Sequence, residues 1–125
     1  MIYTGDSEYK GKFYTDTRNG KSPLFEYVAN LRDKERAKVL KYIRFLREHE
    51  GYLDEPYSKH IKGKIRELRV DFGPNHHRIF YFIFVGKKII LLHAFLKKTA
   101  KTPNSEIQKA EENSYNVLKN PKIYE

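Results

Sequence analysis

The sequence predicts an α+β fold in which an antiparallel β-sheet packs against helices. Three patterns lead to this prediction: apolar residues at helical spacing over residues 23–50, three β-rich segments joined by short turns over residues 65–96, and a second helical pattern after residue 102. The 125 residues suit one domain, and no linker or low-complexity segment divides them. We therefore expect a single domain over residues 1–125 with the element order β-α-α-β-β-β-α, and flexible ends at residues 1–8 and 119–125.

The N-terminal half is predicted to contain one strand and a helical hairpin. Residues 9–15 are rich in aromatic residues and threonine, which favours a strand. Ser22 suits a helix N-cap, and Pro23 suits the first helical position. Asp33 is expected to cap a second helix that ends near Glu50. Both helices carry an apolar side that would pack on one face of the sheet: Leu24, Phe25, Val28 and Leu31 in the first, and Val39, Leu40, Ile43 and Leu46 in the second.

Residues 65–72, 77–85 and 88–96 are predicted to form an antiparallel meander. In the first of these strands apolar and charged residues alternate, which predicts one buried and one solvent-facing side: Leu68, Val70 and Phe72 on the first, and Glu67, Arg69 and Asp71 on the second. The other two strands are apolar on both faces, so their second face needs a cover. We expect this cover to be a protein partner or a helix that starts at Thr102-Pro103 and faces the sheet with Ile107, Ala110, Val117 and Leu118.

The charge balance and the lack of cysteine narrow the class of protein. Lysine and arginine number 25 against 16 acidic residues, a formal charge of +9 that favours binding to a polyanion: RNA, DNA, an anionic membrane or an acidic protein. Without cysteine, disulfides, thiolate catalysis and cysteine-based zinc sites are excluded. The sequence has no apolar run long enough to span a bilayer and no signal-like N-terminus. We therefore expect a cytoplasmic protein that does not bind a membrane.

Cationic residues gather near the ends of the predicted strands. They form three groups that an antiparallel sheet can bring to one edge: Lys59, His60, Lys62, Lys64, Arg66 and Arg69; His76, His77 and Arg78; and Lys97, Lys98 and Lys101. A basic pocket on a rigid sheet is one interpretation. The alternative is that residues 59–64 form a solvated loop and that the two arginines of the first group only pair with Glu67 and Asp71.

Several kinds of catalytic site are missing from the sequence. There is no His-x-x-x-His or Glu-x-x-His helix pattern, no Gly-x-Ser-x-Gly motif and no glycine-rich phosphate loop. His93 fits either a hydrogen-bonded rim histidine or a direct role in a site. Metal-free RNA cleavage remains compatible, because it needs only a group that takes the 2′-OH proton, cations around the phosphate and a donor for the leaving oxygen. We therefore expect no metal and no cofactor.

Five stretches together resemble the HigB-like branch of the RelE/ParE toxin superfamily, including its phage-derived members. They are residues 66–69 (RELR), 77–81 (HRIFY), 91–99 (LLHAFLKKT), 101–103 (KTP) and 106–110 (EIQKA). The resemblance covers roughly residues 9–113. It implies a RelE-like antiparallel sheet with a helical hairpin on one face, a C-terminal helix and a basic concave active site.

The resemblance also implies an activity and partners. Toxins of this kind are metal-independent endoribonucleases that enter the A site of the 70S ribosome and cut the bound mRNA through 2′-OH attack. A cognate antitoxin, HigA-like and often carrying a helix-turn-helix, neutralises them. The implied function is the toxin of a type II toxin–antitoxin system, without a small-molecule cofactor.

The resemblance carries over to individual residues by position. Arg69 and Arg78 match the phosphate-contacting arginines of the family, and Lys97 and Lys98 match the cationic pair after the last strand, so these four are the predicted catalytic residues. The predicted RNA-binding residues are Lys62, Lys64, Arg66, His93 and Lys101. Some members also use a C-terminal tyrosine. Neither Tyr115 nor Tyr124 is aligned to it, so the general base and acid stay unassigned.

Two other functions remain open from the sequence. A ParE-like toxin shares the fold but inhibits DNA gyrase without enzymatic activity and lacks a catalytic set of cations, whereas such cations are present here. A basic DNA-binding or phage accessory protein would have to bind duplex DNA tightly. The predicted last helix is a poor recognition helix, since it has only Lys109 and Lys119 beside several acidic residues.

Overall fold

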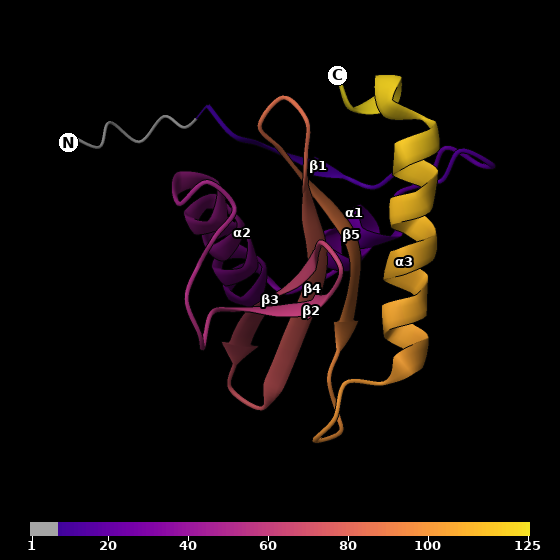
Figure 1. Cartoon of the computed structure of the whole chain (residues 1–125). Coiled ribbons are helices and arrows are strands. Elements are labelled where there is room, and N and C mark those ends of the chain that lie inside the picture. Colours follow the sequence, from indigo (N-terminus) through magenta and orange to yellow (C-terminus); the bar gives the residue numbers. More distant parts are fainter. Residues whose placement is uncertain (1–7) are drawn as a thin grey trace.

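The computed structural model of the protein describes residues 8–125, which form a five-stranded sheet with helices on both faces (Figure 1). The elements are β1 (Lys10–Phe13), α1 (Pro23–Ala29), α2 (Asp33–Glu48), β2 (Ser58–Lys62), β3 (Ile65–Phe72), β4 (Asn75–Phe84), β5 (Lys88–Leu96), α3 (Asn104–Lys119) and a final 3-10 helix, η1 (Pro121–Tyr124). The predicted α+β class is confirmed. Residues 1–7, within the first predicted flexible end, lie outside the described residues.

The sheet is mixed, not antiparallel as the sequence predicted. Its strand order is β1-β5-β4-β3-β2, and β2 to β5 are antiparallel neighbours. β1 instead runs parallel to β5, with Lys10 opposite Lys88. A parallel pair needs a long crossover, which α1, α2 and the meander supply. β2 was not predicted as a strand because its sequence, SKHIK, lacks an alternating apolar pattern and is held by pairing with β3.

The start of the helical hairpin follows the predicted local chemistry only in part. The Ser22 hydroxyl accepts a hydrogen bond from the N–H of Phe25 at 3.4 Å, and Pro23 is the first helical residue. The prediction that Asp33 caps the second helix is wrong. Arg32 occupies the N-cap position, and Asp33 lies in the first turn, where its carboxylate pairs with Arg36 at 2.7 Å.

One face of the sheet packs against α1 and α2. The core on this side consists of the buried residues Leu24, Val28, Val39, Ile43, Leu46, Leu68, Val70, Ile79, Tyr81, Ile89 and Leu91. Phe25 and Leu40, which were predicted to face the sheet, are exposed, because each lies at the edge of its helix's apolar stripe. Phe25 contacts the edge of the Phe13 ring, with the ring centroids 5.8 Å apart.

The opposite face packs against α3, which confirms the predicted cover. The core there consists of Tyr14, Ile65, Phe80, Phe82, Ile90, Leu92, Phe95, Ala110, Val117 and Tyr124. A shift in register between β4 and β5 at Phe80 and Tyr81 leaves Leu92 as an extra residue, so that Leu92 and His93 both face α3. The prediction that Leu118 faces the sheet is wrong, since Leu118 is exposed.

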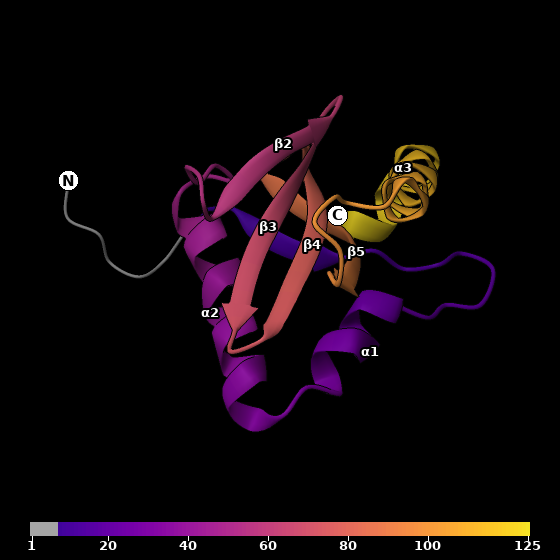
Figure 2. The same cartoon turned by 90° about the horizontal axis from the view of Figure 1, so that it is seen from below.

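Helix α3 covers only part of this face of the sheet, and the 3-10 helix η1 covers a further part. Figure 2 shows α3 beside β5, while β2 and β3 lie farther away across the sheet. Tyr124, in the segment 119–125 that we expected to be flexible, is buried, and its hydroxyl accepts a hydrogen bond from the N–H of Thr15 at 3.0 Å. The later part of β3 is therefore left open on this face. No helix among residues 8–125 is long and apolar enough to cross a membrane.

A candidate cationic active site on the open face of the sheet

The register of β3 and β4 places charged side chains in neighbouring pairs on the face opposite to α1 and α2. Arg69 lies opposite Arg78, and Asp71 lies opposite His76. Residues directly opposite each other in an antiparallel pair have side chains close enough to interact. Lys97 comes next, directly after β5, and its backbone N–H donates to the carbonyl of His76 at 2.8 Å. The three strands therefore bring residues 69, 78 and 97 to one part of the sheet.

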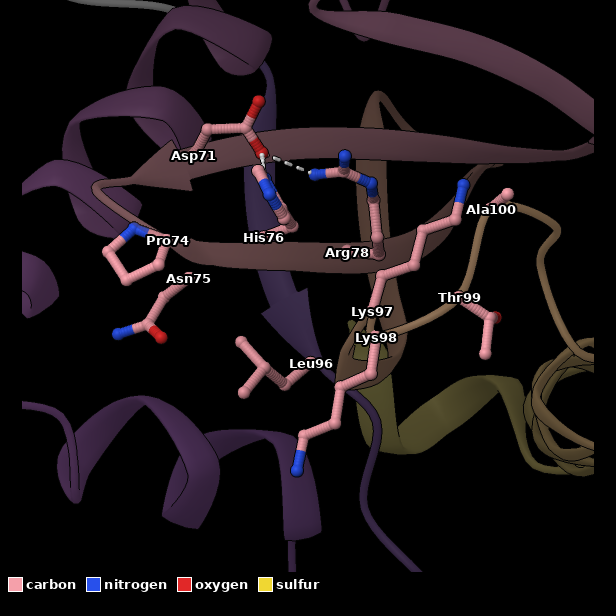
Figure 3. A pocket seen from close by; sticks show the side chains of 10 residues that line it. All are labelled: Asp71, Pro74, Asn75, His76, Arg78, Leu96, Lys97, Lys98, Thr99 and Ala100. Atoms are coloured by element: carbon pink, nitrogen blue, oxygen red, sulfur yellow. Dashed lines mark hydrogen bonds and ion pairs between the residues drawn. The ribbon is translucent and has the colours of Figure 1, made fainter.

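An open cavity of about 530 Å³ lies at this end of the sheet (Figure 3). Its lining comes from the β3–β4 turn and from the segment after β5: Asp71, Pro74, Asn75, His76, Arg78, Leu96, Lys97, Lys98, Thr99 and Ala100. In Figure 3 the Lys97 side chain extends along the same side as the Arg78 guanidinium, and Lys98 extends the other way. Three of the four predicted catalytic residues thus line one cavity.

Asp71 holds the Arg78 and His76 side chains in the cavity. Its Oδ1 accepts hydrogen bonds from Arg78 Nη1 at 2.8 Å and from His76 Nδ1 at 2.9 Å. Partial burial alone would raise the pKa of Asp71, but the hydrogen bonds and charges of Arg78 and His76 outweigh it, so the pKa is below its ordinary value. Arg78 is itself buried, and its Nε has no acceptor within residues 8–125. The carboxylate therefore fixes the guanidinium without using all of its donors.

The fourth predicted catalytic residue, Arg69, is paired with a carboxylate that the sequence placed in solvent. Glu67 is fully buried, which corrects the prediction that it faces solvent. One of its oxygens accepts from Arg69 Nε at 2.9 Å, and the other has no hydrogen-bond partner among the described residues. Glu67 lies opposite Phe80, so the core under α3 covers it. The pairing of Arg69 with Glu67 agrees with the alternative interpretation of this arginine.

Most of the predicted RNA-binding residues lie away from the cavity. Lys62 and Lys64 flank the β2–β3 turn at the other end of β3, where Lys62 pairs with Glu111 of α3 at 3.2 Å. Arg66 lies on the opposite face, because its Nε donates to the Ser58 hydroxyl, which bonds in turn to the buried Tyr81.

His93 and Lys101 also lie outside the cavity lining. His93 hydrogen-bonds to Glu106 of α3 and stacks on Phe95, with the ring centroids 5.9 Å apart, which is the arrangement of a rim histidine. Lys101 is exposed in the segment before α3. The two C-terminal tyrosines differ as well: Tyr115 is exposed on α3, and Tyr124 is buried against Thr15.

The predicted catalytic and RNA-binding residues did not include Asp71, His76 and the buried Glu67, although His76 belonged to one of the three cationic groups. The signal that could have found the first two is the register of the β3–β4 hairpin, which pairs residues 71 and 76 beside residues 69 and 78. Within residues 8–125, no group of three or more His, Asp and Glu residues is placed to hold a metal ion.

A buried network on the other side of β4 holds the strand that carries Arg78. The Tyr27 hydroxyl lies 2.7 Å from His77 Nδ1, and His77 Nε2 lies 2.5 Å from a carboxylate oxygen of Glu35. Glu35 also accepts a hydrogen bond from Asn75 at 3.2 Å. Burial and the Glu35 charge raise the pKa of Tyr27 to about 12, so its hydroxyl stays protonated. Residues of α1 and α2 thereby fix the start of β4 from behind.

Comparison with known proteins gives one family and one kind of relative. Residues 26–114 match the family described as "Phage derived protein Gp49-like (DUF891)". Two curated relatives are each named "Probable endoribonuclease HigB1", from Mycobacterium tuberculosis strains CDC 1551 / Oshkosh and ATCC 25618 / H37Rv. Each is 31% identical over 99 residues, which cover 79% of this chain and 77% of the relative. The matched region spans most of the helical hairpin, the whole meander and most of α3.

Proposed function

Because the chain belongs to the Gp49-like family of phage-derived proteins and is a HigB-like toxin, we propose that it is the endoribonuclease of a type II toxin–antitoxin pair. The observation that carries the proposal is the cavity in which Arg78 and Lys97 lie together, with Arg69 opposite Arg78 on the neighbouring strand. Clustered cations of this kind suit a reaction in which negative charge builds up on a phosphate.

The proposed reaction is an attack of the 2′-oxygen on the adjacent phosphorus. The P–O5′ bond breaks, a base takes the 2′ proton, and the 5′-oxygen gains a proton as it leaves, giving a 2′,3′-cyclic phosphate and a 5′-hydroxyl. Arg78, held by Asp71, is assigned to the phosphate oxygens, with Arg69 as a second donor. Lys97 and Lys98 supply further positive charge at the rim of the cavity. Every step uses side chains alone, without a metal ion.

The substrate we assign is mRNA in the A site of the 70S ribosome. The formal charge of +9 supports association with a particle rich in RNA. A ribosomal target puts the action of the toxin in the cytoplasm. The partner that restrains it is a cognate antitoxin, which we expect to be HigA-like with a helix-turn-helix.

Induced expression followed by mapping of RNA ends tests this function. We expect growth to stop and new mRNA ends to appear inside translated frames, with 2′,3′-cyclic phosphate on the upstream fragments. Arg78→Ala should be tolerated by the cell. Arg18→Ala is a matched control, since Arg18 forms a similar 2.8 Å pair with Asp16 outside the cavity, and it should remain toxic. Growth arrest with intact mRNA and gyrase-dependent DNA breaks would contradict the proposal and support a ParE-like toxin.

A further inference from the structure

Two exposed and two half-buried aromatic side chains form a platform on α2 and the segment that follows it. The aromatic platform consists of Tyr42 and Phe45 on α2 and Tyr52 and Tyr57 in the segment that leads to β2. Tyr52 is 60% exposed and Tyr57 is 50% exposed, which is high for large rings. The Tyr42 ring meets Tyr57 edge to face, with the centroids 6.1 Å apart, and lies 5.9 Å from Phe45. The rings surround a cavity of about 480 Å³.

Cationic side chains lie against the rings of the aromatic platform. The Arg66 guanidinium lies 4.6 Å from the centre of the Tyr52 ring, and Lys38 Nζ lies 5.6 Å from that of Tyr42. Lys41 and Arg44 lie within 6 Å of the Phe45 ring. Stacking rings bordered by cations are the arrangement that binds single-stranded nucleic acid, because the rings take the bases and the cations follow the backbone.

Two carboxylates also line this cavity. Glu48 lies at the C-terminal end of α2, where it pairs with Arg44 at 3.6 Å, and Asp54 lies in the following segment. A carboxylate accepts hydrogen bonds from the amino groups of adenine, guanine or cytosine, and uracil has no amino group. The two carboxylates therefore suit an amino-bearing base, and a purine such as adenine also stacks more strongly than uracil.

The aromatic platform lies on the other side of the sheet from the Arg78 cavity. Arg66 connects it to Ser58 and Tyr81, in the core under α2, whereas Arg69 and Arg78 project from the opposite face. A strand of RNA on the aromatic platform would thus leave the cationic cavity free. Arg66, which the sequence predicted to bind RNA, would then bind it at the aromatic platform and not in the cavity.

We propose that the aromatic platform is a second RNA-binding site, which stacks an amino-bearing base of single-stranded RNA that lies outside the cleavage position. The choice of RNA as the ligand rests on the proposed function. The rings hold the base, the carboxylates accept from its amino group, and Lys38, Lys41 and Arg66 contact the flanking phosphates. The site holds RNA without taking part in its cleavage.

Binding of a fluorescent 2′-O-methyl oligoadenylate octamer tests this site without interference from cleavage, since the 2′-oxygen is blocked. All proteins carry Arg78→Ala so that the cationic cavity contributes little. We expect Tyr52→Ala with Tyr57→Ala to weaken binding at least about fivefold by fluorescence anisotropy, because two stacking rings are lost. Tyr52→Phe with Tyr57→Phe should bind as the parent does, since the rings remain. The oligouridylate octamer should bind more weakly than the oligoadenylate.

Tyr115→Ala is the matched control, because Tyr115 is also exposed and has Lys119 Nζ 5.3 Å from its ring centre, but lies on α3. It should leave the affinity unchanged. An octamer with a central 8-azidoadenosine should cross-link to residue 52 or 57. Equal affinity of the double alanine variant and the parent, at an unchanged melting temperature, would overturn the proposal. Loss of antitoxin binding alone in that variant would do the same and identify a protein-binding surface.

The two proposals fail in different ways. If the protein with Arg78 intact leaves mRNA uncut while octamer binding depends on Tyr52 and Tyr57, the nuclease function fails and the RNA-binding site stands. If mRNA is cut and octamer binding ignores both tyrosines, the nuclease function stands and the second site is refuted.

Discussion

Two adjacent histidines at the start of β4 occupy opposite sides of the sheet and have opposite surroundings. His77 is buried between Tyr27 and Glu35. His76 is exposed, lines the cationic cavity and donates to Asp71. Side chains alternate along a strand, so one step in the chain separates a group that supports the fold from one that a ligand can reach.

The same kind of bond therefore has different consequences on the two sides. On the closed side, a carboxylate, an imidazole and a phenol pair with one another and bind the helices to β4. On the open side, Asp71 orients an arginine and a histidine next to solvent. Changes on the open side should alter activity with little effect on stability, and changes on the closed side should do the reverse.

Arg78→Ala should give the largest effect and acts on the open side. We expect the cleavage rate to fall about 100-fold or more, because an oriented donor to the phosphate is lost. The measurement is mRNA cleavage by purified toxin on programmed ribosomes, with Arg18→Ala as the control. A cleavage rate within threefold of wild type would show that Arg78 takes no part in the reaction.

His77→Phe should give the largest effect on the closed side. Glu35 and Tyr27 lose a buried partner, so the free energy of unfolding should fall by about 2 kcal/mol. Urea unfolding measures this change, and cleavage per folded molecule should stay near wild type. If His77→Phe abolishes cleavage without loss of stability, the separation of the two sides is wrong.

Glu67→Gln examines the boundary between the two sides, because a buried carboxylate there orients an arginine of the open face. We expect cleavage to fall about tenfold, since Arg69 is held less firmly when the charge of Glu67 is removed. Cleavage by the Glu67→Gln and Arg69→Ala single variants and by the double variant measures the coupling. Additive effects would show that Glu67 acts independently of Arg69.

Asp71→Asn should give the smallest effect, a loss of stability that depends on pH. The pKa of Asp71 is lowered from 3.8, so its contribution to stability is present above that value and disappears as the pH falls through the lower, folded-state pKa. The side chain is 55% exposed, which limits the contribution to about 0.5 kcal/mol. At pH 6 the free energy of unfolding, measured with urea, should be higher for wild type than for Asp71→Asn. This difference should shrink below pH 3.8. A difference that grows on acidification would contradict this assignment.

Much of the fold could be predicted from local patterns. The bounds of β3 and β5 agree with the prediction, because alternation and short turns define them. The parallel pairing of β1 could not be predicted, since it depends on which edge of the finished sheet is free. β2 was missed for a similar reason: its polar sequence forms a strand only through pairing with β3.

The part of the candidate site that depends only on where residues lie along the strands could be predicted from the sequence. Arg78 and Lys97 meet because a strand start and a strand end are neighbours in an antiparallel pair. Lys62 and Arg66 were assigned to the same surface from their place in the sequence alone. The length of β3 separates Lys62 from the cavity, and the alternation of side chains puts Arg66 on the other face. The roles of Asp71 and Glu67 could not be predicted, because they depend on the exact register of β3 and β4 and on how far along β3 the cover by α3 extends.

The parallel pairing of β1 with β5 has a consequence for the order in which the newly made chain can fold. β1 is synthesised well before its partner strand, Lys88–Leu96, because α1, α2 and β2 to β4 lie between them in the chain. Pairings between distant segments form late, because a long loop must close first. Lys97 emerges later still, so a nascent chain cannot present a complete cationic cavity. We therefore expect the toxin to become competent only after β5 and the lysines that follow it have left the ribosome that makes it.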